Sequence, residues 1–425
     1  MRSWYRNLDY LTILSWMGLV AIGLVAIYST THGPAAEYLL ESVQRNFERQ
    51  FAWGGISAFV IVVSLLMPVR FFQKVAYGAY ALTLLLILAA LAFGREVNGA
   101  KAWLYIGPVG LQVSELAKVG TVLAVAQLLS SRRPNSSNVR YGLGAVAMIM
   151  VPAILIILQN DTGTALVFVG LVPIMLFWSG LPLSTVMLMI SPAIAGYFAV
   201  VGITQPVFMW IAVAFSVVFT LGLYWRTKER RLALIGALFT GGTIASVTVA
   251  LNQILQPYQL ARIISFTNPE AEEFRRGVGF HLVQSKAAIG SGGLFGKGFM
   301  DGTQTQGAYV PEQSTDFVFS VIAEEWGFIG SMAILVLFAL LLIRLIRLGT
   351  QVKHPFGSMV AAGAAGIYLI HIFINIGMVT GLLPVIGIPL PFISYGGSAL
   401  LANTTMLAIA LNLHMRRDDF SIYGY

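Results

Sequence analysis

Long runs of apolar residues constrain this chain more than any other feature of its sequence. The stretches Tyr10–Ile27 and Val75–Phe93 contain no charged side chain, and each is close to the roughly 18 to 20 residues that a helix needs to cross a bilayer. Of the 425 residues, 57% are hydrophobic and 10% are charged, whereas an average soluble domain carries about 25% charged residues. A soluble fold could not bury this much apolar surface. We therefore expect an all-α, polytopic membrane protein.

The basic residues are concentrated on one side of the expected membrane. The formal net charge is +8, and in a membrane protein such an excess more often sets orientation than binds nucleic acid. If the first span begins near Tyr10, five basic clusters fall on the side of the N-terminus: Arg70/Lys74, Arg132/Arg133/Arg140, Arg226/Lys228/Arg230/Arg231, Arg344/Arg347/Lys353 and Arg416/Arg417. Because cytoplasmic loops are rich in Lys and Arg, we expect two cytoplasmic termini, an even number of spans and no nucleic-acid partner.

Twelve spans fit this pattern best, within a single integral membrane domain of residues 1–425. We place them near residues 10–30, 51–67, 73–93, 113–130, 142–159, 163–180, 183–202, 206–224, 233–252, 316–343, 357–382 and 389–413. Residues 253–315 then form one long extracytoplasmic loop, and loops of this length are usually functional. The chain has no cysteine, which excludes disulfides and thiolate metal sites.

Polar residues at membrane depth are costly, so the few that occur are candidates for function. Glu115 and Lys118 lie three residues apart on the fourth span and can pair on one helix face. They form either a buried ion pair that orients helices or part of a polar cavity. Asp161 precedes Thr162-Gly-Thr164, where an aspartate commonly caps the following helix.

The long loop contains a cluster of acidic and basic residues: Glu270, Glu272, Glu273, Arg275 and Arg276, followed by Lys286 and Lys297. A carboxylate can remove a proton from an attacking hydroxyl, while Arg and Lys can stabilise a departing phosphate. The alternative is a solvated charged turn. Residues 280–289 are expected to form a short amphipathic helix, and the glycines within 290–298 permit tight turns whose amides could face an anion.

A third polar interruption covers residues 383–398. It contains three prolines and three glycines, so we expect a broken or re-entrant segment. Such backbone is tolerated at membrane depth only where protein or a water-filled cavity covers it. The segment is therefore expected to line the site.

Four motifs resemble the SEDS family of cell-wall proteins, which includes RodA and FtsW. They are Trp103 with Gln112–Lys118; Asp161–Thr164; Gln284–Gly293 through Thr315–Phe317 and Glu324–Glu325; and Asn375–Met378 through Ser394–Ser398. Within the family, Gly296–Gln306 is similar to the RodA pattern rather than the FtsW pattern. The resemblance implies an inverting peptidoglycan glycosyltransferase that polymerises lipid II, a lipid-linked disaccharide-pentapeptide, during cell elongation and rod-shape maintenance.

The resemblance also implies a catalytic carboxylate in the long loop, where the family commonly has an Asp. No Asp occurs between Asn268 and Phe280, and the ungapped position is Phe274. We therefore expect Glu273 to be the base, with Glu272 as the second choice. The resemblance is the basis for assigning substrate contacts to a further set of residues: Trp103, Glu115, Lys118, Asp161, Arg49, Arg262, Gln284, Ser285, Lys286, Lys297, Thr315, Asp316, Ser394 and Tyr395.

Family members usually have ten spans, so residues 203–252 are expected to be an inserted helical hairpin. No cofactor is certain, and a divalent cation, Mg or Mn, is the one candidate. The expected partners are lipid II and undecaprenyl-pyrophosphate-linked glycan, a class B penicillin-binding protein transpeptidase and other membrane proteins of the elongation complex. The expected location is the bacterial plasma (inner) membrane.

Two other functions are compatible with the same residues. A flippase or transporter of lipid-linked wall precursors would use a central cavity and the Glu115/Lys118 pair but needs no chemical base. A scaffold that only positions a transpeptidase would depend on its lipid-facing helix surfaces and not on the loop.

Overall fold

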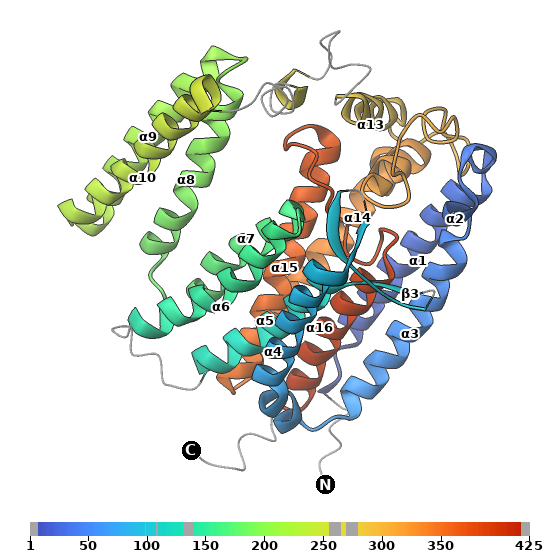
Figure 1. The fold of residues 1–425 in the computed structure, drawn as a ribbon, viewed down its shortest axis with the longest axis horizontal. Coiled ribbons are helices and arrows are strands. Elements are labelled where there is room, and N and C mark those ends of the chain that lie inside the picture. The colour runs from blue at the N-terminus through green and yellow to red at the C-terminus, as the bar shows by residue number, and fades with distance from the viewer. Residues whose placement is uncertain are drawn as a thin grey trace. The chain divides into compact units, whose positions relative to one another are not determined.

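Helices make up most of the structure, a computed structural model that describes residues 7–97, 99–107, 109–130, 139–254, 265–268 and 279–417 (Figure 1). Twelve of the described helices are long: α1 (Tyr10–His32), α3 (Asn46–Leu66), α4 (Val69–Phe93), α5 (Val113–Ser130), α6 (Val139–Leu158), α7 (Thr162–Trp178), α8 (Leu183–Val201), α9 (Pro206–Thr227), α10 (Arg230–Val249), α14 (Val318–Gln351), α15 (Pro355–Thr380) and α16 (Gly397–Met415). Shorter elements are the 3₁₀ helix η2 (Pro34–Tyr38), α2 (Glu41–Gln44), the π-helix η3 (Ala250–Ile254) and α13 (Phe280–Ser291).

The expected all-α membrane fold is confirmed. Each of the twelve expected spans overlaps one long helix, and eleven helical segments of the described chain are long and apolar enough to cross a membrane. The remaining helix, α7, is apolar but has 17 residues. The expected amphipathic helix at 280–289 is present as α13.

The chain divides into two compact units, the first consisting of residues 1–179, 284–382 and 386–425. Its centre is made by α5, α15 and α16, which contact one another and are the most deeply buried of the spans (Figure 1). Around them, α4 and α6 pack on α5, α3 packs on α16, and α7 and α14 pack on α15. The three central helices of the first unit are therefore covered by neighbouring spans.

The second unit consists of residues 180–283 and 383–385, and its long helices are α8, α9 and α10. These three helices contact one another in pairs. The α9–α10 hairpin turns at Lys228, which adopts a left-handed conformation with φ of 56°, and a hydrogen bond between Ser216 and Thr240 (2.6 Å) joins the two helices. That this hairpin is an insertion stays a prediction.

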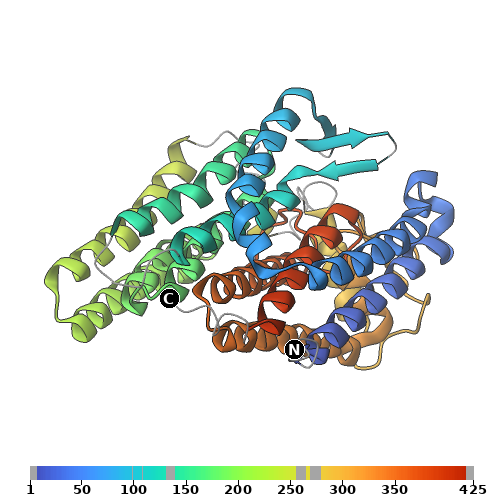
Figure 2. The same ribbon diagram turned by 90° about the horizontal axis from the view of Figure 1, so that it is seen from below.

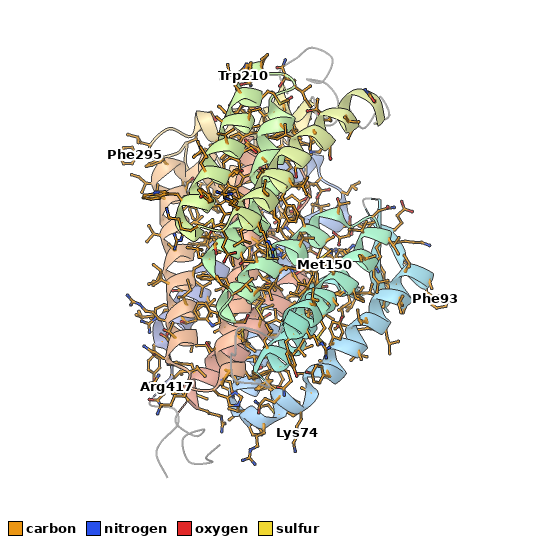
Figure 3. The ribbon with its side chains drawn as sticks, turned by 90° about the vertical axis from the view of Figure 1, so that its left-hand side faces the viewer. Lys74, Phe93, Met150, Trp210, Phe295 and Arg417 are labelled. Atoms are coloured by element: carbon orange, nitrogen blue, oxygen red, sulfur yellow. The ribbon has the colours of Figure 1, made fainter. Side chains whose placement is uncertain are left out.

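Basic residues gather at one end of the first unit. Lys74 and Arg417 lie at this end, and Phe295 lies toward the other (Figure 3). Arg344 donates to Asp9 Oδ2 from both Nε (3.0 Å) and Nη2 (2.8 Å), and Asp9 in turn caps the start of α1. The ion pair thus fixes α1 against α14 at this basic end.

A small antiparallel sheet was not expected from the sequence. Its strands are β1 (Arg95–Val97), β2 (Ala100–Ile106) and β3 (Val109–Gln112), in the order β1-β2-β3 (Figure 2). Residue Gly107, with φ of 62°, supplies the left-handed conformation between β2 and β3. Since β3 runs directly into α5, the sheet fixes the start of the helix that carries Glu115.

The segment 386–396, which we call the re-entrant segment, is non-helical, as its prolines predict. The expected span at 389–413 was therefore placed too early, because α16 begins only at Gly397. Gln50 holds the segment by donating to the Ser394 carbonyl (3.1 Å) and accepting from the Gly396 amide (3.1 Å). Asn375 donates to the Ile388 carbonyl (2.7 Å). Two side-chain amides thus replace hydrogen bonds that a helix would have made internally.

Helix α14 is broken at Gly327, whose φ is 66°. The loop after α13 fills the break: Phe328 N donates to Gly293 O (2.9 Å) and Ile329 N to Leu294 O (3.1 Å). In the other direction, Lys297 N donates to Glu324 O (3.0 Å) and Gly298 N to Glu325 O (3.0 Å). The amides of Lys297 and Gly298 therefore donate to backbone carbonyls of the protein. The expectation that amides of this stretch face an anion is wrong for these two residues.

Close packing of α1 on the re-entrant segment yields a stability prediction. A Cβ added at Gly23 would lie 2.6 Å from the Ile393 carbonyl oxygen, so we expect Gly23→Ala to lower the free energy of unfolding by about 1–3 kcal/mol. Gly55→Ala is the control, because a Cβ at that position meets nothing within 4 Å. Thermal unfolding in detergent micelles checks both, and equal midpoints for Gly23→Ala and the unmodified chain would contradict the packing.

Candidate functional site

Polar side chains of the first unit meet where α5, α7, α14 and α16 begin. Asp161 is the centre of this group. Its Oδ1 accepts from the Thr164 amide (3.0 Å), which caps α7 as the sequence predicted. Its Oδ2 accepts from Gln112 Nε2 (3.2 Å) and Ser114 Oγ (3.0 Å). Asp161 therefore joins the starts of α5 and α7 in addition to capping a helix.

The sheet and the start of α16 extend this polar group. The Gln112 amide donates to Ser398 Oγ (3.0 Å), which links β3 to the start of α16. Trp103 lies on β2 directly opposite Gln112 in the sheet and is half-buried. Trp103 is thus placed at the edge of the polar group, and its role as a substrate contact stays a prediction.

Asp316 stands two residues before α14 and next to the re-entrant segment. Its carbonyl accepts from Asn375 Nδ2 (2.9 Å), and a Cβ at Gly387 would lie 3.3 Å from Asp316 Oδ2. Burial, followed by the negative charges of Glu312 and Asp161, raises the pKa of Asp316 from 3.8 to about 7. A carboxyl group of this kind can take up or release a proton near neutral pH.

A buried ion pair lies deeper, inside α5. Lys118 Nζ is 2.9 Å from Glu115 Oε1 and 2.8 Å from Oε2, and both side chains are buried. Lys118 Nζ is also 2.7 Å from His371 Nε2, and His371 Nδ1 is 3.0 Å from the Pro389 carbonyl oxygen. An ammonium group can only donate, so His371 accepts at Nε2 and donates its Nδ1 proton to Pro389.

The ion pair expected between Glu115 and Lys118 is therefore present, and it connects α5 to α15 and to the re-entrant segment. Sequence reasoning missed its third member. His371 lies alone in an apolar span, where the only available signal is that ionisable residues within spans are costly and tend to be paired. We call the group Glu115, Lys118, His371, Gln112, Ser114, Asp161 and Asp316 the polar column.

Several predicted site residues make structural contacts outside the polar column. Lys297 Nζ binds Glu324 Oε1 (2.7 Å), Ser291 Oγ (2.7 Å) and Thr303 Oγ1 (2.6 Å). Ser285 is buried and contacts Ser320 Oγ and the Val379 carbonyl oxygen, each at 2.7 Å. These polar groups are occupied by the protein itself.

Of the remaining described candidates, three make hydrogen bonds within the protein and three lie on helices with at least partly exposed side chains. Thr315 donates to Glu312 Oε2 (2.8 Å), and the buried Ser394 accepts from the Leu390 amide (2.8 Å). The Tyr395 amide donates to the Ser314 carbonyl (2.8 Å). Three further candidates lie on helices: Gln284 is half-buried on α13, Lys286 is exposed on α13, and Arg49 is exposed on α3. Their substrate contacts stay predictions.

Glu272 and Glu273, the expected catalytic carboxylates, lie outside the described residues, as does Arg262. Among the residues that the structure does describe, no three His, Asp or Glu side chains come together to hold a metal ion. The Mg or Mn candidate stays a prediction.

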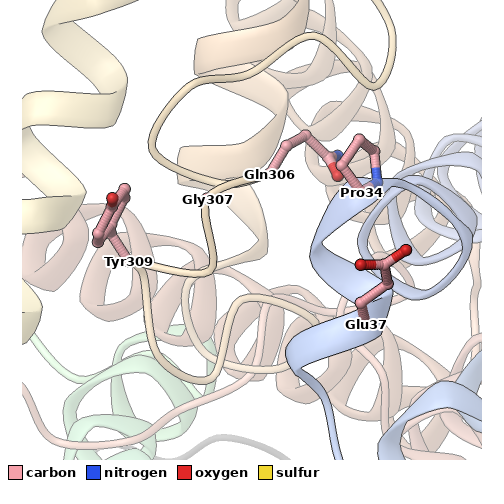
Figure 4. Close-up of a pocket in the computed structure, with 5 residues that line it drawn as sticks. All are labelled: Pro34, Glu37, Gln306, Gly307 and Tyr309. Carbon is pink, nitrogen blue, oxygen red and sulfur yellow. The ribbon is translucent and has the colours of Figure 1, made fainter.

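A separate pocket of about 490 Å³ lies between η2 and the loop before α14. Pro34, Glu37, Gln306, Gly307 and Tyr309 line it, and none of them belongs to the polar column (Figure 4). Beside it, Gln306 Nε2 donates to Glu325 Oε1 (2.9 Å) and to Ser29 Oγ (2.9 Å), and Ser29 also binds Glu325. These bonds tie the loop to α1 and α14.

Comparison with known sequences agrees with the four motifs. The model of the FtsW/RodA/SpoVE family, described as cell cycle proteins, matches residues 9–213 and 198–419. The chain is 31% identical to peptidoglycan glycosyltransferase RodA of Treponema pallidum, over 95% of this chain and 96% of the relative. It is 32% identical to peptidoglycan glycosyltransferase MrdB of Escherichia coli K12, over 88% and 87% of the two chains.

Solved structures show the same likeness. A chain from a peptidoglycan synthase complex, studied for how it coordinates polymerization and crosslinking, superposes with a TM-score of 0.71 at 28% identity, covering 96% of this chain and 98% of that chain. The crystal structure of the rod shape determining protein RodA from Thermus thermophilus superposes with a TM-score of 0.61 at 27% identity, covering 96% and 97%. This chain belongs to the FtsW/RodA/SpoVE family, and it is RodA-like.

The buried ion pair yields a prediction about stability. Lys118→Met leaves Glu115 buried without its counter-ion, so we expect the free energy of unfolding to fall by about 3–5 kcal/mol. The double variant Glu115→Gln with Lys118→Met removes both charges and should recover part of this loss. Lys74→Met is the control, because Lys74 is an exposed lysine on α4. Thermal unfolding that is unchanged in Lys118→Met would show that the pair contributes nothing.

A second prediction concerns pH. The raised pKa of Asp316, about 7 against 3.8, means that folding favours its protonated form. The stability that Asp316 contributes is therefore complete below about pH 4 and is lost as the pH rises to about 7. Between about pH 4 and pH 7, we expect the melting temperature of the unmodified chain to fall relative to that of Asp316→Asn. Above about pH 7, the difference between the two melting temperatures should stay constant. The exposed Asp301, changed to Asn, is the control, and parallel curves throughout would refute the shift.

Proposed function

We propose that this chain polymerises lipid II into glycan strands, as a RodA-type peptidoglycan glycosyltransferase acting in cell elongation. Two relatives that it matches along most of its length bear that enzyme name. The observation that carries the proposal is the polar column, in which the carboxylates of Asp161 and Asp316 at the helix starts continue into a buried Glu115–Lys118–His371 group within the spans.

The proposed reaction is an inverting displacement. A hydroxyl of the lipid-linked acceptor attacks the anomeric carbon of the growing strand, so a carbon–oxygen bond forms there while the bond to undecaprenyl pyrophosphate breaks. The hydroxyl proton passes to a carboxylate, and undecaprenyl pyrophosphate leaves with the electron pair. We assign Glu273 as the base and Glu272 as its alternative. Asp316 supports this chemistry because it can hold a proton near neutral pH.

The proposed location is the bacterial inner membrane. The basic end of the first unit, marked by Lys74 and Arg417 in Figure 3, would face the cytoplasm with both termini. The polar column and the loop before α14 would then open toward the outer side. A substrate that carries its sugar on a membrane-bound polyprenyl chain is accessible to a site at this level.

The proposed partner is a class B penicillin-binding protein transpeptidase, together with other membrane proteins of the elongation complex. Support comes from the structural neighbour that belongs to a peptidoglycan synthase complex in which polymerization and crosslinking are coordinated. In such an assembly, this chain would extend the glycan strand and its partner would cross-link it.

Neutralising the loop carboxylate tests the reaction. We expect Glu273→Gln, reconstituted with lipid II, to polymerise at least about 100-fold more slowly than the unmodified chain, because a positioned general base typically contributes 10²–10⁴-fold. Binding of lipid II should be retained. Gel analysis of glycan products, run with and without Mg²⁺ or Mn²⁺, measures the rate and the need for a cation.

Glu272→Gln and Glu270→Gln are the matched controls, each a neutralised carboxylate of the same cluster. Full activity of Glu273→Gln with loss in Glu272→Gln would move the base by one residue. Full activity of all three would refute a catalytic carboxylate here. If polymerisation is absent from the unmodified chain while lipid II crosses vesicle membranes, the chain is a flippase.

A further inference from the structure

The turn after α13 carries apolar side chains that the protein leaves uncovered. Leu294 is 64% exposed and Phe295 is 79% exposed, and Phe295 points away from the helices in Figure 3. We call Gly293–Gly296 the loop tip. Large apolar side chains at a loop outside the spans are costly in water, so a tip of this composition indicates an apolar surrounding.

Backbone hydrogen bonding in the loop tip is compatible with such a surrounding. Carbonyl oxygens of Gly293 and Leu294 accept from the amides of Phe328 (2.9 Å) and Ile329 (3.1 Å), and the Gly296 amide donates to the Gly292 carbonyl (2.8 Å). Unpaired backbone groups are expensive at the hydrocarbon boundary. The hydrogen bonds between the tip and the broken part of α14 thus pair backbone groups that a spanning helix would pair internally.

The same bonds place the loop tip beside the apolar outer face of α14. Phe328 is 56% exposed and Ile329 is 53% exposed, and the exposed stripe continues through Met332 and Val336 at four-residue spacing. This spacing keeps the stripe on one helix face. The tip therefore extends a surface that α14 presents to lipid.

The level of the tip in the membrane follows from the length of α14. Phe328 precedes Arg344 by 16 residues, which is about 24 Å of helix at 1.5 Å per residue, compared with a hydrocarbon thickness of about 30 Å. Arg344 marks the basic end through its ion pair with Asp9. Phe328, and with it the loop tip, thus lies near the opposite hydrocarbon boundary.

Charge does not oppose this placement. Lys297, the first charged residue after the tip, turns its ammonium group inward to Glu324 (2.7 Å). No other charged side chain lies between Lys286 and Asp301 in the sequence. The tip is consequently an uncharged apolar wedge.

We propose that Leu294 and Phe295 insert into the hydrocarbon edge of the outer leaflet and anchor the loop between α13 and α14 to the membrane. The anchoring itself depends on geometry, and only the choice of leaflet rests on the proposed function. Held in this way, the loop would keep a constant height relative to a substrate whose polyprenyl chain is buried in the same leaflet.

The absence of cysteine from the sequence allows a direct depth measurement. A nitroxide attached to Phe295→Cys, in vesicles of phosphatidylglycerol and phosphatidylethanolamine, should be readily relaxed by oxygen and several-fold less accessible to an aqueous nickel chelate than the same label at Tyr309→Cys. Tyr309 is an exposed aromatic residue of the same polar loop. Val336→Cys, on the exposed stripe of α14, gives the value for a label within the bilayer.

Equal nickel accessibility at Phe295 and Tyr309 would overturn the proposal. Protection that appears only after a class B transpeptidase is co-reconstituted would also overturn it, because the tip would then be a protein contact. The depth measurement needs no catalytic activity, so its result is independent of whether Glu273 is the base. As a second readout, Leu294→Ser with Phe295→Ser should raise the KM for lipid II in vesicles several-fold while leaving thermal unfolding unchanged.

Discussion

Backbone that leaves the helical hydrogen-bond pattern must find other partners where water is scarce, and this requirement organises the first unit. Residues 386–396 are non-helical between two spans, yet Gln50 and Asn375 supply side-chain amides to the backbone at Ser394, Gly396 and Ile388. Because Asn375 also binds the Asp316 carbonyl, the same amide that supports the re-entrant segment positions a carboxylate of the polar column. Asn375 thus supports the non-helical backbone and positions Asp316 at the same time.

The break in α14 follows the same rule with a carboxylate at its centre. Glu324 accepts six hydrogen bonds, from Ser291, Lys297, Thr303, the Gln304 amide and the amide and hydroxyl of Thr305. A buried charge is tolerated when it is paired and fully hydrogen-bonded. These bonds hold residues 291–305 against the N-terminal part of α14.

Hydropathy predicted the spans well because every helix that crosses the membrane needs about 20 mainly apolar residues. Hydropathy alone did not predict the start of α16 or the small sheet. The last span was expected from residue 389, although Pro389 and Pro391 lie within it and α16 begins only at Gly397. The sheet of residues 95–112 was missed because its short strands depend on cross-strand partners that a single sequence does not display.

The candidate site was predicted in part for comparable reasons. Glu115 and Lys118 could be paired from their spacing, since three residues along a helix fix a common face. His371 could not be assigned to them, because its contact with Lys118 spans 253 positions in sequence. The raised pKa of Asp316 likewise arises mainly from burial, then from Glu312 four residues earlier and from Asp161. The burial and the approach of Asp161 depend on the fold.

The charge of the polar column limits what it can bind. Within the described residues of the column, Lys118 is the one cation, and Glu115 neutralises it. Asp161 and Asp316 add two further acidic groups to the column. The negative charge of Asp161 is one reason that Asp316 holds a proton near neutral pH. A pyrophosphate leaving group therefore finds no uncompensated positive charge there. If the chain acts as proposed, the column suits the neutral sugar and its hydroxyl proton, whereas the pyrophosphate requires basic residues elsewhere, such as Arg49 on α3 or Arg262, Arg275 and Arg276 of the long loop.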